Sequence, residues 1–377
     1  MKLDIRAFLI GVILFTVLGS IYYFVINPGG VYFLVAGLII GALFGFILQR
    51  GRFCMNSAFR DIILLKEFKL AKAVAVALAV LAVGFSIFAF ALGLDLSQAI
   101  GGLKNGFMPW AAIVGGLVFG IGMVFAGGCA SGTTYRVGEG MMGSVVAAIG
   151  LTVGALMTRD GALNIVATGL KSVNLGPDLT IFGLYNAFLT PLLMLILGIV
   201  GIVLMFYFWG WPALKRKLES NEPLIKTENF VEATFKKAYP WWVTGILIGL
   251  VLTAGLVASS GVVGITGGWM NISTWLTDGT GLGWSGFIIF GVLIGAIVSA
   301  INANEFKLRV PKEGWTLLKQ FFGGLLMGFG AVTAMGCNIT NILGGIPILS
   351  LHSIIAGACI MFGSWIAAYF LFMWKQE

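Results

Sequence analysis

The stretch GGLVFGIGMVFAGGCASG at residues 115–132 recurs as GGLLMGFGAVTAMGCNIT at residues 323–340. Nine of the fifteen aligned positions through the cysteine are identical, at a single offset of 208 residues. Self-similarity at a fixed offset indicates an internal duplication. Both copies are glycine-rich apolar runs that end in Gly-Cys and then change character abruptly. This pattern predicts two membrane helices that break at equivalent cysteines, where irregular backbone lines a cavity or is buried in protein.

A weaker echo precedes each copy of this repeat. The segment GALFGFILQRGRFC at 41–54 matches GVLIGAIVSAINAN at 291–304, with Asn304 in the position of Cys54. The first half carries about 42 additional residues between its two motifs, enough for one more membrane span. An odd number of inserted spans can invert the second motif relative to the first.

The composition places the chain in a membrane. Hydrophobic residues make up 59% of it and charged residues 10%, whereas soluble domains are near half apolar and a quarter charged. About ten apolar runs approach or reach the length that crosses a bilayer as a helix, near 8–27, 31–48, 73–94, 109–127, 143–157, 180–208, 241–259, 284–303, 317–335 and 354–374. We therefore predict an all-α polytopic membrane protein of about ten spans, with re-entrant or broken helices and an internal repeat around a central pore.

These runs and the loops between them divide the chain into four parts. We expect an extra N-terminal transmembrane helix at 1–30, a first half at 31–210, a cytoplasmic linker at 211–240 and a second half at 241–377. Residues 8–27 are read as a retained helix, because no small-x-small cleavage site of a secretory signal follows them.

The net charge of +8 does not indicate a nucleic-acid partner. Lys and Arg gather in the loops at 49–72, 211–240 and 304–320, and cytoplasmic loops of membrane proteins are basic. We therefore place these loops and both termini in the cytoplasm, and the protein in the bacterial inner membrane.

Four cysteines without a CxxC pair or a histidine cluster predict neither a metal site nor a cofactor. Cys54, Cys129 and Cys337 each lie at an expected helix break near glycine, so we expect them to line the pore. Cys359 lies in the middle of the last apolar run and is read as a small core residue. His352, the single histidine, is read as interfacial packing without a functional role.

Arginines close to these cysteines point to an anionic ligand. A sulfur-bearing oxyanion suits the combination, because guanidinium and backbone N–H groups bind oxygens while a neutral S–H donates weakly to sulfur. Arg136 could instead form a structural ion pair with Glu139. The expected substrate site comprises Cys54, Cys129, Cys337, Gly128, Ala130, Gly336, Asn338, Arg52 and Arg136.

Five segments carry a resemblance to a known family, and they are LQRGRFCMNSAFRD (48–61), GGCASGTTYRVGEG (127–140), GITGGW (264–269), EFKLRVPK (305–312) and GGLLMGFGAVTAMGCN (323–338). From about residue 31 onward the chain resembles the YeeE/YedE family of thiosulfate transporters. The resemblance implies uptake of thiosulfate through three pore cysteines by successive S–H···S contacts, at the positions of Cys54, Cys129 and Cys337. It also implies a small cytoplasmic TusA-like sulfurtransferase as partner.

We rank transport of thiosulfate first and do not expect an enzyme. Two alternatives remain open. A membrane sulfurtransferase would form a cysteine persulfide and leave sulfite behind. A transporter could also carry a selenium compound or another sulfur compound, since some relatives are linked to selenium metabolism. The lack of a GxxxxGK[ST] motif and of a soluble domain of useful size argues against an ATP-driven pump.

Overall fold

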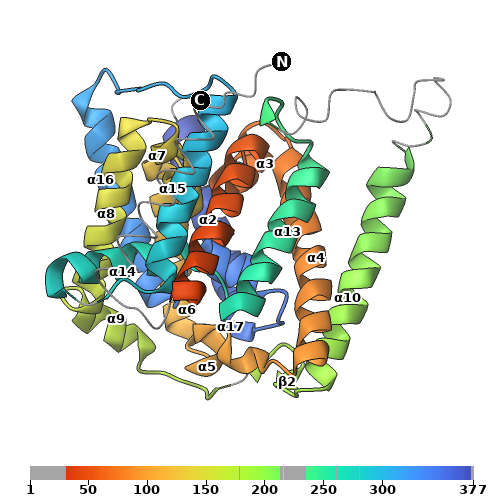
Figure 1. Ribbon diagram of the computed structural model, residues 1–377. Helices are drawn as coiled ribbons and strands as arrows, with labels where there is room; N and C mark the ends of the chain where they lie inside the picture. Colours follow the sequence, from red (N-terminus) through yellow and green to blue (C-terminus); the bar gives the residue numbers. More distant parts are fainter. Residues whose placement is uncertain are drawn as a thin grey trace.

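The computed structural model describes residues 31–374, apart from 178, 213–214, 216–234, 260 and 280. In this part of the chain the protein is almost entirely helical (Figure 1), and its one sheet is a hairpin of two short strands, β1 (Leu179–Thr180) and β2 (Gly183–Leu184). The all-α prediction is therefore confirmed. The expected first helix and most of the expected linker lie outside the described residues.

The long helices follow the apolar runs of the sequence. They are α2 (Val31–Gly51), α4 (Lys69–Leu92), α6 (Pro109–Ala126), α8 (Met142–Arg159), α10 (Leu189–Met205), α13 (Trp241–Ser259), α15 (Trp284–Asn302), α16 (Gly314–Thr333) and α17 (Leu351–Ala368). Shorter helical segments connect them: α3 (Met55–Leu64), η1 (Leu96–Gln98), α5 (Gly101–Lys104), α7 (Ala130–Gly138), α9 (Asn164–Lys171), η2 (Phe206–Gly210), α14 (Ile265–Asp278), η3 (Ile339–Gly345) and η4 (Tyr369–Met373).

Among the described residues, eight helices are long and apolar enough to cross a membrane. The predicted count of about ten spans is therefore not confirmed. One of the two missing spans, 8–27, lies outside the described residues. The other corresponds to α16, a full-length helix whose hydropathy is lowered by Lys319, Gln320 and several glycines and which packs between α6 and α8. The span expected from residue 180 begins later, at Leu189, because the hairpin occupies its first residues.

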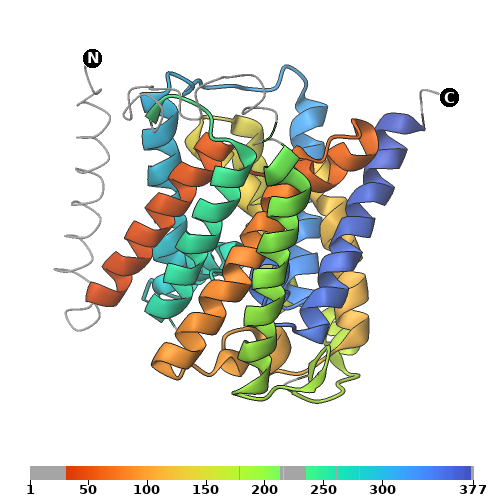
Figure 2. The same cartoon turned by 90° about the vertical axis from the view of Figure 1, so that its right-hand side faces the viewer.

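The two copies of the duplicated helix, α6 and α16, cross each other and run in opposite directions. Gly115 of α6 approaches Ala334 of α16, whereas Gly122 approaches Met327, so the helices are antiparallel. The preceding helices α2 and α15 are parallel neighbours (Figure 1), because Gly41 approaches Ile288 and Gly45 approaches Val292. The second motif is thus inverted relative to the first, as one inserted span allows. The inserted span is α4, which packs against α13 and α10 on the outside of the bundle (Figure 2).

Glycines set the distance between the central helices. A Cβ on Gly295 would lie 1.9 Å from the carbonyl oxygen of Ala42, and one on Gly324 would lie 2.1 Å from that of Ala147. Because lipid is as apolar as leucine, membrane helices associate through such close backbone packing of small residues. The glycine-rich sequence is therefore the direct cause of a tight bundle.

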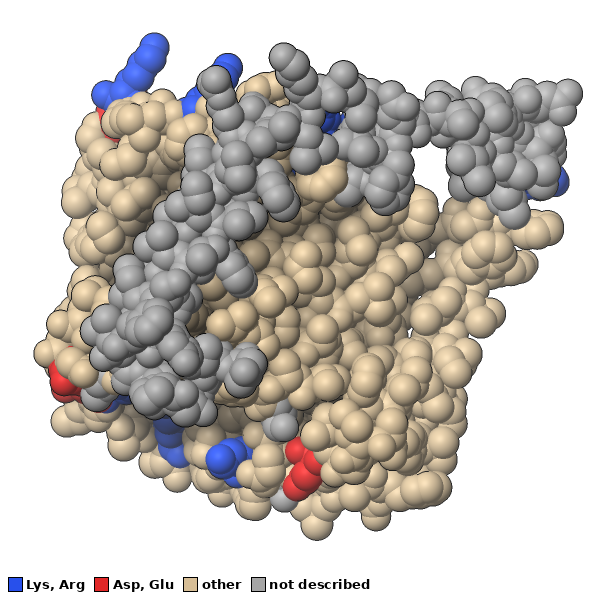
Figure 3. All heavy atoms as spheres, in the orientation of Figure 1, with Lys and Arg blue, Asp and Glu red and all other residues tan. Residues whose placement is uncertain are grey.

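Charged side chains gather at the two ends of the bundle. Figure 3 shows them at the upper and lower rims, with uncharged side chains over most of the face between. The upper end, where α4 and α16 begin, has an excess of basic residues: the connections at 65–69 and 303–313 carry Lys66, Lys69, Lys307, Arg309 and Lys312 beside Glu67, Glu305 and Glu313. The lower end carries acidic and basic residues together, namely Asp95, Lys104, Arg159, Asp160, Lys171 and Asp278. This distribution suits a multi-pass membrane protein.

Replacing Gly295 with Ala tests the close contact between α2 and α15. The added Cβ forces the two helices apart, so we expect a loss of about 1–3 kcal/mol of stability and a lower melting temperature of the detergent-purified protein. The matched control is Gly267→Ala in α14, where no atom lies within 4 Å of the added carbon. That variant should melt at or above the temperature of the parent. Equal melting temperatures for both variants would contradict the packing argument.

Candidate functional site

Two of the predicted pore cysteines are in contact. The sulfur atoms of Cys54 and Cys129 lie 3.7 Å apart, and their exposed fractions are 1% and 0%. Cys54 is the residue directly before α3, and Cys129 is the residue directly before α7. Two helix N-termini therefore meet at one pair of buried thiols. The first N–H groups of a helix lack partners within the helix, so this point favours an anion.

The break after α6 explains how Cys129 reaches this position. Gly127 ends the helix in a left-handed conformation, with φ of 75°, which glycine adopts without strain. Cys129 is extended, and its sulfur accepts a hydrogen bond from the backbone N–H of Gly132 at 3.3 Å. The hydroxyl of Ser131 also lies 3.3 Å from this sulfur. The thiol is thus fixed by the first turn of the helix that follows it.

Gly132 makes room for the pair. A Cβ at this position would lie 2.6 Å from the sulfur of Cys54 and 3.3 Å from that of Cys129. Any side chain here would separate the two thiols or displace α7. The sequence analysis did not include Gly132 in the site, although its place three residues after Cys129 in a glycine-rich motif is the signal that could have found it.

Arg136 lies beside this motif, as predicted. Its Nη1 donates to the carbonyl oxygen of Gly127, and a Cβ on Gly128 would lie 3.1 Å from the same nitrogen. Among the described residues Arg136 forms no ion pair with Glu139, which instead accepts a hydrogen bond from Gln49 at 3.1 Å. The guanidinium therefore adds positive charge at the end of α6.

A cavity of about 310 Å³ opens next to Gly127. Its wall includes Arg136 from α7, Arg309 from the segment before α16, and the polar side chains of Ser144 and Gln320. No carboxylate belongs to this lining. The cavity combines two cationic side chains with neutral donors, which suits an oxyanion.

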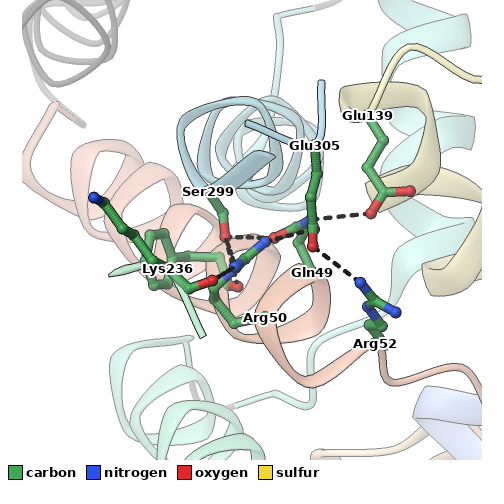
Figure 4. Close-up of polar contacts among 8 residues, drawn as sticks. Gln49, Arg50, Arg52, Glu139, Lys236, Ser299 and Glu305 are labelled. Atoms are coloured by element: carbon green, nitrogen blue, oxygen red, sulfur yellow. Dashed lines mark hydrogen bonds and ion pairs between the residues drawn. The ribbon is translucent and has the colours of Figure 1, made fainter. Parts of the chain in front are cut away.

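Arg52 lies in a different environment from the one predicted. Its side chain is 68% exposed and contacts Glu305 at 2.9 Å. The buried Arg50 binds the other carboxylate oxygen of Glu305 at 2.6 Å, and Gln49 donates to that oxygen at 2.7 Å (Figure 4). The structure therefore brings Arg52 together with Glu305, not with the thiols.

This network around Glu305 anchors one wall of the cavity. The segment that follows Glu305 runs beside the corner between α7 and α8, where Arg309 N–H donates to the Gly140 carbonyl at 2.9 Å. Met142 N–H donates to the Arg309 carbonyl at 3.0 Å. Burial alone raises the pKa of Glu305, but hydrogen bonds from Gln49 and Arg52 and the charges of Arg50 and Arg52 outweigh it. The pKa of this carboxyl therefore lies below its usual value.

Cys337 occupies the equivalent break after α16. It is fully buried, and its sulfur lies 3.8 Å from the hydroxyl of Thr340. Met335, the counterpart of Gly127, has a φ of 56°. Asn341 donates to the Gly336 carbonyl at 2.9 Å, just as its counterpart Thr133 donates to that of Gly128 at 3.5 Å. Both breaks are thus closed by the same kind of contact.

Asn338 is the unusual residue of this second break. Its side chain has an exposed fraction of 0%, and neither its amide nitrogen nor its amide oxygen has a hydrogen-bond partner among the described residues. Leaving a buried polar group unpaired costs about 1–3 kcal/mol. A group that carries this cost is a candidate for binding a transient ligand.

The remaining predicted positions are placed as follows. Ala130 is buried directly after Cys129, and a Cβ on Gly336 would lie 2.8 Å from the side chain of Thr340. Because Ala334 lies opposite Gly115 on the antiparallel α6, the two breaks are roughly 17 Å apart along that helix. The structure thus unites Cys54 with Cys129 and places Cys337 separately.

The other cysteine and the histidine lie outside this pair. Cys359 is half-buried on α17, and its Cβ packs where Gly116 of α6 leaves space. His352 is fully buried, and its Nε2 lies 3.1 Å from the carbonyl oxygen of Ala334. The sequence suggested only packing for this histidine, whereas the structure makes it a hydrogen-bond partner of the backbone just before the second break. In the part of the chain that the structure describes, no group of three or more His, Cys, Asp or Glu side chains could hold a metal ion.

Comparison with known proteins finds relatives that match most of this chain. A family model described as sulphur transport matches residues 50–366. A protein named thiosulfate transporter TsuA from Spirochaeta thermophila is 38% identical over 350 residues, which cover 89% of this chain and 98% of that protein. A protein of the same name from Escherichia coli is 31% identical over 353 residues, which cover 91% of this chain and 96% of its own. A probable transporter, YedE of Escherichia coli, is 39% identical over 85 residues, or 22% of this chain and 21% of its own.

The charge state of Glu305 supplies a test of the network. A carboxyl with a lowered folded-state pKa contributes stability at neutral pH, and this contribution is lost as the pH falls through that pKa. Glu305→Gln should therefore cost about 2 kcal/mol at pH 7, because hydrogen bonds to charged groups are lost. As the pH falls below about 4, toward and through the lowered pKa, the difference from the parent should shrink progressively. Melting temperatures of the detergent-purified proteins between neutral and acidic pH measure both the loss of stability at pH 7 and its decrease at low pH.

Asp160→Asn serves as the control, since Arg159 and Asp160 form an exposed pair with side-chain exposures of 38% and 59%. Exposed pairs contribute little, so this variant should match the parent at every pH. A deficit of Glu305→Gln that stays constant down to low pH would show that the carboxylate charge is not the cause.

Proposed function

This chain belongs to the sulphur-transport family, and we propose that it takes up thiosulfate across the bacterial inner membrane through Cys54, Cys129 and Cys337. The observation that carries this proposal is the pair of buried thiols in contact at two converging helix N-termini. Backbone N–H groups and Arg136 meet the oxygens of the ion, and the thiols meet its terminal sulfur. The two relatives named thiosulfate transporters, each matched over nearly its whole length, support the choice of ion.

The two stations along the route differ in their donors. Cys54 and Cys129, together with Gly128 and Ala130 of the same break, form the station that we call the first; in the orientation proposed below it is the one nearer the cytoplasm. Cys337 forms the second with Gly336 and Asn338, whose free amide can donate to an oxygen of the ion. Several weak sites in series let an ion enter and also leave, whereas one tight site would hold it. All three thiols are buried, so the ion advances only when neighbouring segments move.

The charged ends of the bundle support an orientation. We place the lysine-rich upper end in the cytoplasm, because cytoplasmic loops of membrane proteins are basic. The cavity beside Gly127 then lies toward the cytoplasm, and Arg136 and Arg309 in its wall hold the ion there. Arg52 acts at the same end through Glu305, since both are tied to the segment that carries Arg309. A TusA-like sulfurtransferase on this side would consume the ion.

The division of the chain belongs to the same proposal. Residues 31–210 and 241–377 are two sulfur-transport halves, with an extra N-terminal helix at 1–30 and a cytoplasmic linker at 211–240. Consumption of the ion matters energetically, because moving two negative charges inward against a potential of 100 mV costs about 4.6 kcal/mol. Rapid use of the sulfur inside the cell, or cotransport with another ion, would offset this cost.

The first test is uptake of thiosulfate whose two sulfur atoms carry different isotopes, into cells that lack other sulfur importers. With the parent protein both labels should enter together. Cys129→Ser and Cys337→Ser should reduce uptake at least tenfold with unchanged protein in the membrane, because the hydroxyl does not reproduce the sulfur contact. Cys359→Ser is the matched control and should transport as the parent does.

Other outcomes discriminate the alternatives. Entry of the terminal sulfur label alone would indicate a membrane sulfurtransferase that leaves sulfite outside. Entry of neither label would favour a selenium compound or another sulfur compound. Normal uptake by both serine variants would refute the cysteine route.

Asn338 offers a second test, because structural and functional roles predict opposite results. Asn338→Leu removes an unpaired buried amide, so the folded protein should gain about 1–2 kcal/mol while thiosulfate uptake falls several-fold. Asn341→Leu is the control, since its nitrogen donates to the carbonyls of Ala334 and Gly336 and its oxygen accepts from Ser353. That variant should lower the melting temperature. A destabilised Asn338→Leu would show that the amide has a structural partner.

A further inference from the structure

The contact between Cys54 and Cys129 has a chemical consequence beyond weak hydrogen bonding. The two sulfur atoms lie 3.7 Å apart, and a disulfide bond is about 2 Å long, so a relative shift of about 2 Å would bring them to bonding distance. Gly132 leaves the space between them free of a side chain. The other two cysteines have no such neighbour, because Cys337 contacts Thr340 and Cys359 packs on Gly116.

The surroundings of the pair also suit a nucleophilic sulfur. The thiolate is the reactive form of cysteine, and backbone N–H groups at helix N-termini and nearby arginines stabilise it. Both sulfurs lie at such N-termini, and Gly132 N–H points at Cys129. Arg136 lies at the same break. The same groups attract an anionic sulfur compound, so a reactive oxyanion and a dithiol would meet at one point.

We propose that the Cys54–Cys129 pair is a redox site that reduces tetrathionate, the dianion in which two thiosulfate units are joined by a central S–S bond. Tetrathionate carries the same terminal sulfonate oxygens as thiosulfate and the same charge of two, so the proposed anion route admits it to the pair. The inference depends on the proposed function in one respect, namely that the anion route lets tetrathionate reach the two cysteines.

The reaction proceeds by two thiol–disulfide exchange steps. One cysteine loses its proton, attacks a central sulfur of tetrathionate and forms a mixed disulfide, and the central S–S bond breaks to release thiosulfate. The second cysteine loses its proton and attacks the sulfur of the first, which releases the second thiosulfate. In total two thiols and one tetrathionate give one protein disulfide, two thiosulfate ions and two protons. The pair loses two electrons, and tetrathionate gains them.

Oxidation closes the route. A disulfide between Cys54 and Cys129 has no S–H donor, and it links α3 to α7 across the first station. Uptake of thiosulfate should therefore fall at least tenfold in the oxidised protein and return after treatment with a dithiol such as dithiothreitol. The pair thus stops import when the outside supply is the oxidised dimer of the ion.

The decisive experiment counts thiols in the full-length protein, purified in detergent under nitrogen and treated with tetrathionate. After denaturation, a maleimide reagent that adds a resolvable mass should label four cysteines before treatment and two after it. Two thiosulfate ions should be released per protein, and a proteolytic peptide should link Cys54 to Cys129. In the control variant Cys359→Ser the count should fall from three to one.

Several results would overturn the inference. Unchanged thiol counts, or equal loss of Cys337 and Cys359, would show that the pair has no special reactivity. Disulfides between separate molecules would show the same. Because the readout is thiols and released thiosulfate, it is independent of uptake. Loss of two thiols in a protein that fails to import thiosulfate would support the redox site and refute only the proposed transport.

Discussion

The antiparallel crossing of α6 and α16 is the constraint on which the rest of the structure depends. Gly115 of α6 meets Gly330 of α16, and Gly122 meets Gly323. In the duplication Gly115 corresponds to Gly323 and Gly122 to Gly330, so the same two glycines of the repeat form both contacts. The flanking helices repeat the pattern, since α17 lies on α6 as α8 lies on α16. At these glycines the backbone of one helix lies directly against the other helix. The crossing therefore fixes the ends of α6 and α16, and with them the positions of Cys129 and Cys337.

Breaking a helix inside a membrane leaves backbone groups that water cannot satisfy. Both breaks solve this problem in the same way. A left-handed residue ends the helix, and the side chain five residues after the glycine that precedes the cysteine donates to the carbonyl of that glycine. At the first break, the guanidinium of Arg136 also covers the carbonyl of Gly127. At the second break, the imidazole of His352 covers that of Ala334. These hydrogen bonds hold the backbone on either side of Cys129 and Cys337 in place.

Much of this fold could be predicted from the sequence because the determining features are local or repeated. The length of the apolar runs located most of the membrane spans, and the internal repeat located the two helix breaks. The one span inserted in the first half allowed the second copy to be inverted. Contacts between distant segments could not be predicted: nothing in the chain pairs Cys54 with Cys129, 75 residues away, or Arg52 with Glu305, 253 residues away. The proximity of Arg52 to Cys54 in sequence was misleading, because Arg52 is itself left-handed and its side chain turns toward the surface. A charged residue that is close to a cysteine in sequence can therefore point its side chain away from the thiol when the backbone turns between them.

In the proposed route, the anion would pass two separate stations along a buried path. At the first, Cys129 already has partners in Ser131 and Gly132, so the station is complete without a ligand. At the second, Asn338 has no hydrogen-bond partner in the described part of the chain. The chain continues there as the π-helix η3, a form that often marks functional sites. The breaks lie roughly 17 Å apart along α6, a distance that no single ion spans. Asn338, whose amide has no partner among the described residues, lies directly before η3, so the buried amide and the irregular helix adjoin at this station.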